Sequence, residues 1–484
     1  MLPRRHVLRL GAAALAGAAL PLSPSVAADL RPRPTFPLRA AADGHYLVDA
    51  KNIPFLIVGD SPQAIYQQLT PEEVDTYLAF RQAQGFSALL CDPAYSNNND
   101  GHVRPARNGH FPFLRDIHGG NWDGTSGAAD FSTPDPAYWD NVAQVMAKAE
   151  ARGFVVLHYV LAWGYGGKTM WLDLINRRNT IEVCRAFGEF LGRRFRDQAN
   201  VIWIDGSDYN GDTRPRAPDG SSGIARALAI AEGMQAAGAR QLRTGDWMAD
   251  SLSTDQTPFA PLMTVNGVYA YGDKVGFNAT YVQAHRAYLH QPPLPAFLKE
   301  SGYEAEKMIP GDPASVRKYE WWCLLSGATA GVIYGNGDIW PFPAGRWQAA
   351  LRMPGGADMA RLGAFMRGLD WYALVPSELA GMRRLVISPN GGATPTRPDY
   401  VAAAQTQDGR TLVAYVPPFR SGTQSLTLDL AGMAGESEAT WWDPTSAQTH
   451  PAGRFARGTR PELTTPGRNV AGANDWVLLL RSAE

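Results

Sequence analysis

Hydrophobic and polar positions follow two different rhythms along this chain. Up to about residue 369, apolar runs of strand length alternate with longer segments of helical spacing. Eight runs are predicted to be strands: 54–58, 86–91, 154–160, 200–204, 242–244, 263–265, 294–298 and 331–334. Eight such units in roughly 330 residues predict a (β/α)8 barrel, an α/β fold also called a TIM barrel. A doubly wound open sheet is the alternative, but no glycine-rich dinucleotide motif follows the first strand.

The segments between these runs predict helices with recognisable ends. The first opens with Thr70 as N-cap, Pro71 at the first helical position and Glu73 completing a capping box, and Gly85 ends it. Further helices are expected at 135–152, 180–196, 222–237, 278–290, 315–326 and 357–369. A hairpin is expected before the barrel, formed by 46–48 and 54–58. The connection at 92–131 is unusually long, which favours a functional loop.

Beyond about Val375 the rhythm changes to short alternating stretches separated by turns rich in Pro, Gly and Asn. The stretches are 385–387, 400–404, 411–416, 425–430, 439–442 and 476–480. Six such strands predict a small β-sandwich. The predicted domains are therefore a barrel at 29–375 and a sandwich at 376–484. We expect the sandwich to pack on the barrel as a structural accessory, with Asp443 capping one of its turns.

The first 28 residues have the features of an export signal. Arg4 and Arg5 begin a basic region, an apolar stretch spans 10–22, and small residues at 25–28 suit cleavage. Paired arginines are typical of the twin-arginine route, and the ordinary secretory route is the alternative. The apolar stretch is too short to span a bilayer, and no later segment is long and apolar enough. We therefore expect a periplasmic or secreted mature protein without a membrane span.

Composition narrows the function classes. The formal net charge is −1 and no Lys/Arg cluster stands out, so a nucleic-acid partner is not expected. The chain has 14 Trp, whose flat faces suit the apolar faces of sugars, although many must serve the core. Its three cysteines are far apart in apolar segments, which favours buried thiols over disulfides or zinc. The run 97–100 offers oxygen ligands for a cation, but a solvated loop is favoured. No cofactor or metal is expected.

Acidic residues at the ends of the predicted strands are the candidate catalytic groups, since barrel enzymes act where strands end and βα loops begin. Glycoside hydrolysis needs two carboxyl groups across the scissile bond. Strands four and seven end roughly opposite each other, which pairs Asp208 with Glu300. Alternatively, Asp205 is the catalytic carboxylate and Asp208 caps a loop. Asp60 and Asp92 follow strands one and two.

Aromatic and histidine side chains near the strand ends are candidates for sugar binding. Each has a structural alternative, because His158 can be a core histidine and each tryptophan can serve packing. The candidates are His158, Trp163, Trp171, Trp247 and Trp340.

Several motifs resemble those of the apiosidase-like barrel domain of glycoside hydrolase family 140, and the similarity covers nearly all of the mature chain. Its most specific part is the run from Glu300 to Glu304, which resembles a Glu-x-x-Tyr-Glu signature. The others are Gly59-Asp60, Thr70 to Glu73, Tyr77-Leu78, Arg81, Gly85-Phe86, Asn200 to Ile204 and Gly206-Ser207-Asp208. Downstream, Trp441 to Pro444 resembles the collagen-binding-like sandwich that often follows this barrel.

The resemblance implies a retaining mechanism with Asp208 as acid/base and Glu300 as nucleophile. It also implies that Asp60 helps to bind sugar hydroxyls, although Asp60 can instead bond only backbone. Tyr303 is a further candidate for substrate binding, and Glu304 is expected to support Tyr303 or a neighbouring Arg rather than act on substrate. The chain departs from the pattern at Ser207, where a second glycine is usual. It also lacks the histidine expected within 245–247. Both departures concern the preference for apiose more than the chemistry.

Three functions follow as hypotheses, all with a glycan partner. The first is an exo-acting retaining glycosidase on a plant cell-wall or similar branched glycan. The second is a carbohydrate-binding protein without catalysis, against which the presence of both Asp208 and Glu300 argues. The third is another glycosidase, such as an arabinofuranosidase or β-glycosidase, on the same scaffold. The sequence makes no prediction of oligomeric state.

Overall fold

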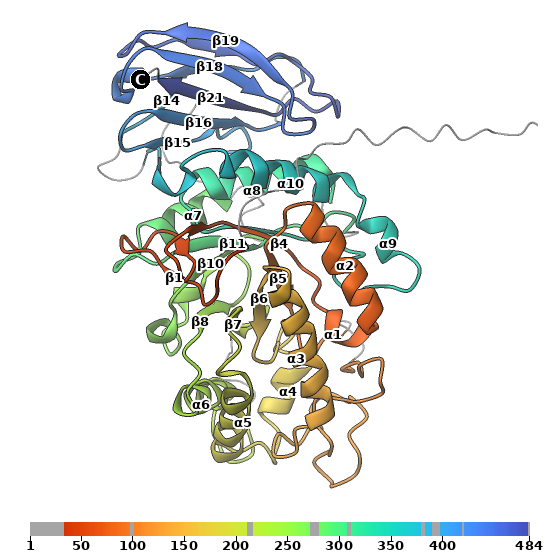
Figure 1. The fold of residues 1–484 in the computed structure, drawn as a ribbon. Coiled ribbons are helices and arrows are strands. Elements are labelled where there is room, and N and C mark those ends of the chain that lie inside the picture. The colour runs from red at the N-terminus through yellow and green to blue at the C-terminus, as the bar shows by residue number, and fades with distance from the viewer. Residues whose placement is uncertain are drawn as a thin grey trace, which may run out of the picture. The chain divides into compact units, whose positions relative to one another are not determined.

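The barrel predicted from the sequence is present in a computed structural model that describes residues 33–96, 101–210, 216–271, 280–306, 311–378, 383–389, 397–418 and 421–482. Eight parallel strands follow one another around it (Figure 1). They are β4 (Ile57–Asp60), β5 (Ala88–Cys91), β6 (Val155–Tyr159), β7 (Val201–Gly206), β8 (Leu242–Asp246), β10 (Asn266–Tyr269), β11 (Ala296–Glu300) and β12 (Gly331–Tyr334). A short strand, β9 (Ser251–Leu252), lies antiparallel to β10. Between β8 and β10, the Val265 N–H donates to the carbonyl of Arg243 at 3.1 Å, which nearly closes the barrel.

Helices surround this sheet. They are α1 (Ile65–Gln68), α2 (Pro71–Ala83), α3 (Pro136–Ala151), α4 (Met170–Leu174), α5 (Ile181–Phe195), α6 (Gly223–Ala236), α7 (Thr280–Tyr288), α8 (Pro313–Leu325), α9 (Trp347–Ala350) and α10 (Pro354–Arg367). The capping box at the start of α2 is present as expected, with Thr70 and Glu73 bonding each other's backbone N–H. Short 3-10 turns occupy 253–255, 260–262, 371–373 and 430–432.

The sixth barrel strand was placed three residues too early from the sequence. The apolar run 263–265 only leads into β10, whose first two residues are Asn266 and Gly267. The hydroxyl of Ser253 accepts a hydrogen bond from the Gly267 N–H at 2.8 Å, so polar groups pack where an apolar residue was expected. The long connection at 92–131 contains isolated β-bridges, for example between Asp116 and Ala129, and buried aromatic side chains.

Successive side chains of each barrel strand point alternately to the barrel interior and to the helices. In β7, Ile202 and Ile204 belong to the interior cluster, whereas Trp203 packs in the cluster under the helices. By the same alternation Asp205 points to the helices. This alternation decides which residues at the end of a strand face the barrel mouth.

A small hairpin sheet precedes β4, as expected, and covers the strand starts. It consists of β1 (Arg39–Ala40), β2 (Leu47–Val48) and β3 (Pro54–Phe55). The Thr329 hydroxyl donates to the His45 carbonyl at 2.6 Å, two residues before β12 begins. Gly44 lies against Pro293, just ahead of β11. The hairpin therefore lies at the end of the barrel where the strands begin.

The C-terminal part consists of two antiparallel sheets. One has the order β13 (Leu374–Pro376), β15 (Ala402–Thr406), β16 (Thr411–Val416), β21 (Trp476–Ser482), β18 (Ser437–Trp442) and β19 (Thr449–Phe455). The other has the order β14 (Val386–Ser388), β17 (Ser425–Leu428) and β20 (Glu462–Thr464). Strands β13, β19 and β20 were not expected. The outward face of β19 is largely exposed, so its sequence lacks the apolar alternation of a half-buried strand.

The six-stranded sheet packs on both of its faces. Leu412, Ala414 and Val416 pack toward the smaller sheet, whereas Val413 and Tyr415 join the cluster under the barrel helices. Trp321 of α8 stacks on Tyr415 with ring centroids 5.8 Å apart. The sandwich thus packs on the barrel.

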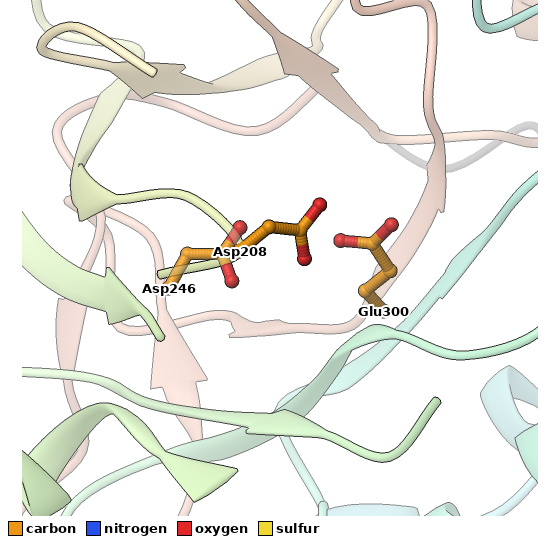
Figure 2. Close-up of side chains that lie close together, drawn as sticks. All are labelled: Asp208, Asp246 and Glu300. Atoms are coloured by element: carbon orange, nitrogen blue, oxygen red, sulfur yellow. The ribbon is translucent and has the colours of Figure 1, made fainter. Parts of the chain in front are cut away.

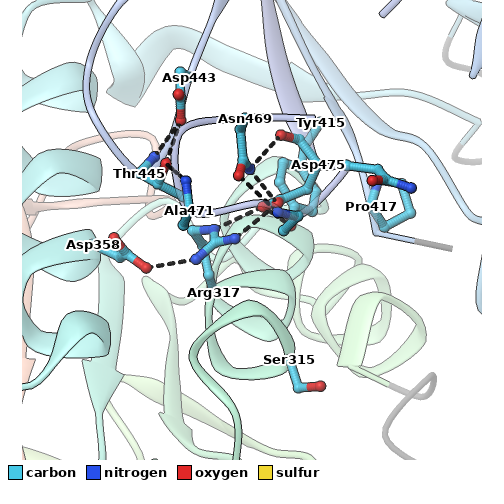
Figure 3. A network of polar contacts seen from close by, with 12 residues as sticks. Ser315, Arg317, Asp358, Tyr415, Pro417, Asp443, Thr445, Asn469, Ala471 and Asp475 are labelled. Carbon is cyan, nitrogen blue, oxygen red and sulfur yellow. Dashed lines mark hydrogen bonds and ion pairs between the residues drawn. The ribbon is translucent and has the colours of Figure 1, made fainter. Parts of the chain in front are cut away.

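A buried ion network crosses this junction (Figure 3). Arg317 of α8 donates to both carboxylate oxygens of Asp475 at 2.7 Å and to Asp358 of α10 at 2.5 Å. The Asn469 amide and the Tyr415 hydroxyl also donate to Asp475, at 2.8 and 3.0 Å. Each guanidinium nitrogen of Arg317 and each carboxylate oxygen of Asp475 therefore has a bonding partner, and the network ties the sheet to the helices.

The three cysteines are buried free thiols, as expected. Asp443 accepts from Thr445 and Ser446 and so caps a turn, as expected. Within the described ranges, no helix has the length and apolarity needed to cross a membrane. The expected signal at 1–28 and the run 97–100 lie outside the described residues.

Candidate active site

A pocket of about 680 Å³ opens where the barrel strands end. Its lining comes from the βα connections of most strands and includes Asp208, Glu300, Tyr303 and Trp340. Asp92 also lines it, with a backbone N–H bond from Ala94 at 2.8 Å, and burial raises the pKa of Asp92 to about 7. The strand-end rule therefore located the pocket from the sequence.

The segment after β7 is bent sharply to present Asp208. Gly206, Ser207 and Asp208 have φ values of 95°, 137° and 47°, three successive residues in a region that favours glycine. A Cβ on Gly206 would lie 2.1 Å from the Asp246 carbonyl oxygen, to which the Ser207 N–H donates at 2.7 Å. This anchor holds the turn and directs Asp208 across the pocket.

An extra residue in β11 directs Glu300 into the pocket. Leu298 pairs with Val268 of β10, and the next pair joins Glu300 to Tyr269, so Lys299 is the additional residue of a β-bulge. Phe297 belongs to the interior cluster and Leu298 to the outer one, and unbroken alternation would point Glu300 at the helices. With the bulge, Lys299 and Glu300 both face inward.

The carboxyl groups of Asp208 and Glu300 face each other, with Asp246 on the far side of Asp208 (Figure 2). One oxygen from each of the three lies within 4.8 Å of the others. Among the described residues this is the cluster with metal-ligand geometry. The Lys299 ammonium lies 2.5 Å from Asp246 and 2.9 Å from Glu300, so a protein cation already neutralises part of its charge.

Two tyrosines complete the surroundings of this cluster. The Tyr159 hydroxyl donates to Asp246, and the Tyr269 hydroxyl donates to Asp208. Burial raises the pKa of both phenols well above 10, so they remain donors. The Lys299 ammonium lies 3.9 Å from the centre of the Tyr269 ring, a cation–π contact that helps fix both groups.

The electrostatics separate the two facing carboxyl groups. Burial, followed by the charges of Glu300 and Asp246, raises the pKa of Asp208 well above its usual range. Burial also raises the pKa of Glu300, but Lys299 opposes the rise. The pKa of Lys299 is itself raised despite its burial, because Asp246 and Glu300 hold the charged form. A proton is therefore favoured on Asp208 and a negative charge on Glu300.

Tyr303 and Trp340 line the pocket beside Glu300. The Tyr303 hydroxyl bonds Glu300 and also lies 2.8 Å from the Ser61 hydroxyl. The amide of Gln63 spans the two aromatic residues, donating to Tyr303 at 3.3 Å and accepting from the Trp340 indole at 2.9 Å. The Glu304 carboxylate bonds Tyr334, Asn336 and the Gly355 N–H, so the expected support of Tyr303 is not among its hydrogen bonds.

Asp60, His158 and Asp205 do not line the pocket, because each points to the helices. Asp60 is fully buried and accepts from Arg81 and Tyr77, both at 2.6 Å, so the expected contact with sugar hydroxyls is replaced by a structural ion pair. Burial lowers the pKa of His158 to about 3, and its ring packs against Trp203 as a core histidine. Asp205 is held by Arg243 at 2.6 and 2.8 Å.

Three of the four tryptophans expected to form sugar platforms are packing residues instead. Trp163 and Trp247 are almost completely buried, with ring centroids 5.7 Å apart. The Trp247 indole donates to the Ser253 carbonyl at 2.9 Å, and its ring fills the space beside Gly206. Trp171 is likewise buried against Trp163, so neither of these rings nor that of Trp171 lines the pocket.

The sequence reasoning overlooked Asp246, Lys299, Tyr159 and Tyr269. Asp246 obeys the strand-end rule, but the expected strand stopped at residue 244. A lysine inside the apolar run of β11 was the visible signal for Lys299. Tyr159 and Tyr269 are each the last residue of a barrel strand, at a position whose side chain points to the barrel interior by strand alternation.

Comparison with known proteins gives the family. A model described as "Apiosidase-like, catalytic domain" matches residues 41–373. The chain belongs to this family. Residues 390–481 match a model described as "Putative collagen-binding domain of a collagenase". No curated protein sequence matches the chain.

Solved structures give the same fold for this apiosidase-like protein. A glycoside hydrolase structure superposes with a TM-score of 0.72 at 19% identity, covering 92% of this chain and 97% of the other. A glycoside hydrolase family 5 structure from Bacteroides vulgatus has a TM-score of 0.72 at 20% identity, covering 92% and 93%. The similarity therefore extends over barrel and sandwich together. Family and fold show that the protein is a glycoside hydrolase.

Proposed function

We propose that this apiosidase-like protein is a retaining, exo-acting glycosidase on plant cell-wall or similar branched glycans. Asp208 is the acid/base and Glu300 the nucleophile. In the first step Asp208 donates its proton to the glycosidic oxygen while Glu300 attacks the anomeric carbon, which releases the leaving group. In the second step Asp208 takes a proton from water, and the water displaces Glu300 from the sugar.

The separation of the two carboxyl groups is the observation that carries this proposal. Their nearest oxygens lie within 4.8 Å. Retaining enzymes place the two groups about 5–5.5 Å apart, whereas inverting enzymes need about 6.5–9.5 Å to admit water. The raised pKa of Asp208 supports the acid role, because this group must hold a proton near neutral pH.

The shape of the pocket supports exo action. Its lining is drawn from many connections around the barrel mouth, from Gln63 after β4 to Trp340 after β12. A pocket lined from many sides suits the terminal residue of a glycan better than a residue in the middle of a chain. Trp340, held by its bond to Gln63, offers an aromatic face beside Glu300.

The test measures hydrolysis of aryl glycosides, including apioside, arabinofuranoside and β-glucoside, and of cell-wall oligosaccharides. Wild type is compared with Asp208→Ala and Glu300→Ala. Proton NMR of the first-formed sugar identifies the anomer. Asp338→Asn is a useful comparison, because Asp338 lines the same pocket but pairs with Arg346 at 2.5 Å.

We expect both alanine variants to lose several orders of magnitude in kcat/KM, and azide to rescue Glu300→Ala as an inverted glycosyl azide. Asp338→Asn should change KM more than kcat and show no response to azide. An inverted first product would contradict the retaining mechanism. Glycan binding without hydrolysis of any substrate by wild type would favour a carbohydrate-binding protein. The sugar released by wild type distinguishes apiosidase from another glycosidase.

We also propose that residues 1–28 export the protein through the twin-arginine route to the periplasm or beyond. The observation is the Arg4-Arg5 pair ahead of an apolar stretch. Replacing both arginines by lysine should keep the protein in the cytoplasmic fraction of a bacterial host. Unchanged export would instead indicate the ordinary secretory route.

A further inference from the structure

A second cavity of about 770 Å³ lies far from the catalytic pocket. Its walls come from the β1–β2 hairpin, the end of α7, the segment leading into β13, the β15–β16 turn and the last strand. The hairpin covers the starts of the barrel strands, so this groove is at the opposite end of the barrel from Asp208 and Glu300. None of its lining residues also lines the catalytic pocket.

Aromatic rings form one side of this groove. Tyr46 and Tyr372 are both half-buried, with ring centroids 5.1 Å apart and planes tilted by 35°. Behind them His45 stacks on Tyr288, with centroids 4.3 Å apart. The Tyr372 hydroxyl donates to Asp370 at 3.0 Å, which helps hold this ring in place. Partly exposed, fixed aromatic faces of this kind suit the apolar C–H faces of sugar rings.

Hydrogen-bonding groups of both kinds surround these rings. Carboxylates accept and guanidinium groups donate, as a ligand rich in hydroxyl groups requires. The groups are Asp43, Asp370, Asp408, Arg410 and Arg481. Burial lowers the pKa of His45, so its imidazole is neutral near pH 7. Three negative and two positive side chains leave the lining at about −1, which disfavours anionic ligands such as phosphates or uronates.

We propose that this groove binds a neutral oligosaccharide segment and so holds the enzyme on a polymeric substrate while the opposite end of the barrel cleaves. The inference rests on the proposed action on glycans. Because the two sites lie at opposite ends of the barrel, the bound segment belongs to a different part of the polymer from the residue being released. Binding here raises the local concentration of chain ends without a new contact in the catalytic pocket.

Isothermal titration with cellohexaose, xylohexaose, arabinohexaose and galactohexaose tests the groove. The background is Glu300→Gln, which prevents turnover. In this background, Trp340→Ala weakens the catalytic pocket and Tyr372→Ala removes one aromatic face of the groove. Tyr372→Phe is the matched control, since it keeps the ring and loses only the bond to Asp370. Thermal melts establish that each variant is folded.

At least one hexasaccharide should retain binding in Trp340→Ala, and Tyr372→Ala should weaken that binding about tenfold, while Tyr372→Phe retains most of it. On the otherwise wild-type enzyme, Tyr372→Ala should lower kcat/KM several-fold on the polymer and leave an aryl glycoside unaffected. The proposal is overturned if Trp340→Ala abolishes all binding, or if Tyr372→Ala changes polymer and aryl glycoside activity equally. Failure of the proposed function would appear separately, as absent hydrolysis of every aryl glycoside.

Discussion

Lys299→Met should shift the pH profile of the enzyme to higher pH, and the acid limb should shift most. The Lys299 ammonium lies 2.9 Å from Glu300 and lowers the pKa of that carboxyl group. It also lowers the pKa of Asp208, with a smaller share of the total effect. The acid limb of kcat/KM reports ionisation of the nucleophile in the free enzyme. With the ammonium removed, Glu300 holds its proton to higher pH, and the enzyme becomes active only at higher pH.

The size of this change follows from the geometry. Two unit charges about 4 Å apart at an effective dielectric constant of about 20 interact by about 4 kcal/mol, which corresponds to about three pH units. Water that enters the space of the ammonium group screens part of this energy. We therefore expect the acid limb to move by about one to two pH units. The alkaline limb, set by Asp208, should move in the same direction by less.

Asp246→Asn is the matched opposite perturbation. The Asp246 charge raises the pKa of both Asp208 and Glu300, so its removal should move the profile to lower pH. The amide keeps an acceptor for the Tyr159 hydroxyl. The assay is kcat/KM on an aryl glycoside between pH 3 and 10 (roughly the range in which carboxyl and amine groups titrate). Shifts in the same direction for both variants, or a uniform loss of activity without any shift, would refute the electrostatic role of Lys299.

Three further perturbations test the scaffold. Gly206→Ala should lower kcat/KM about 100-fold, because its Cβ would displace the catalytic turn, whereas Gly220→Ala, also at positive φ but in open space, should not. Tyr303→Phe should lower kcat/KM about 10- to 100-fold and move the acid limb to higher pH, since it removes a hydrogen bond to Glu300, the proposed nucleophile. Arg317→Met should lower the unfolding free energy by about 3–5 kcal/mol in urea melts by stranding buried Asp475, and adding Asp475→Asn should restore part of the loss.

The rhythm of the sequence was sufficient to predict the fold. Seven of the eight barrel strands were predicted at positions that overlap the observed ones. The clearest of them, β5, β7 and β11, combine an apolar run with a following helix that has a side-chain N-cap. The exception, β10, begins with Asn266 and Gly267, and the Gly267 N–H lies against the hydroxyl groups of Thr244 and Ser253 rather than against apolar side chains. In the sandwich, β13 spans the predicted domain boundary at 375, since it follows the 3-10 turn at 371–373 directly and pairs with β15. No break in composition marks such a strand.

The predicted catalytic pair lies in the pocket at the strand ends, whereas several of the predicted substrate-binding residues do not. Parallel barrel strands are buried on both faces, so their sequences are apolar at every position and conceal which residues point inward. The strand-end rule alone therefore could not distinguish Asp60 and His158, which point to the helices, from Asp246, which points to the pocket. Counting alternate positions along each strand from an interior residue, such as Ile57 in β4, would have separated them.

Strand alternation alone, however, would have excluded Glu300 from the pocket. Counting from the interior Phe297 assigns Lys299 to the pocket and Glu300 to the helices, and only the bulge at Lys299 reverses the second assignment. Across the pocket, three successive positive φ angles, the last of them at Asp208 itself, redirect the chain. Both facing carboxyl groups are thus presented by departures from regular strand geometry, which cost conformational energy and persist because the barrel around them is rigid. Strand-end position had already paired Asp208 with Glu300 in the sequence, and the motif resemblance, which does not depend on regular alternation, supported the same pair.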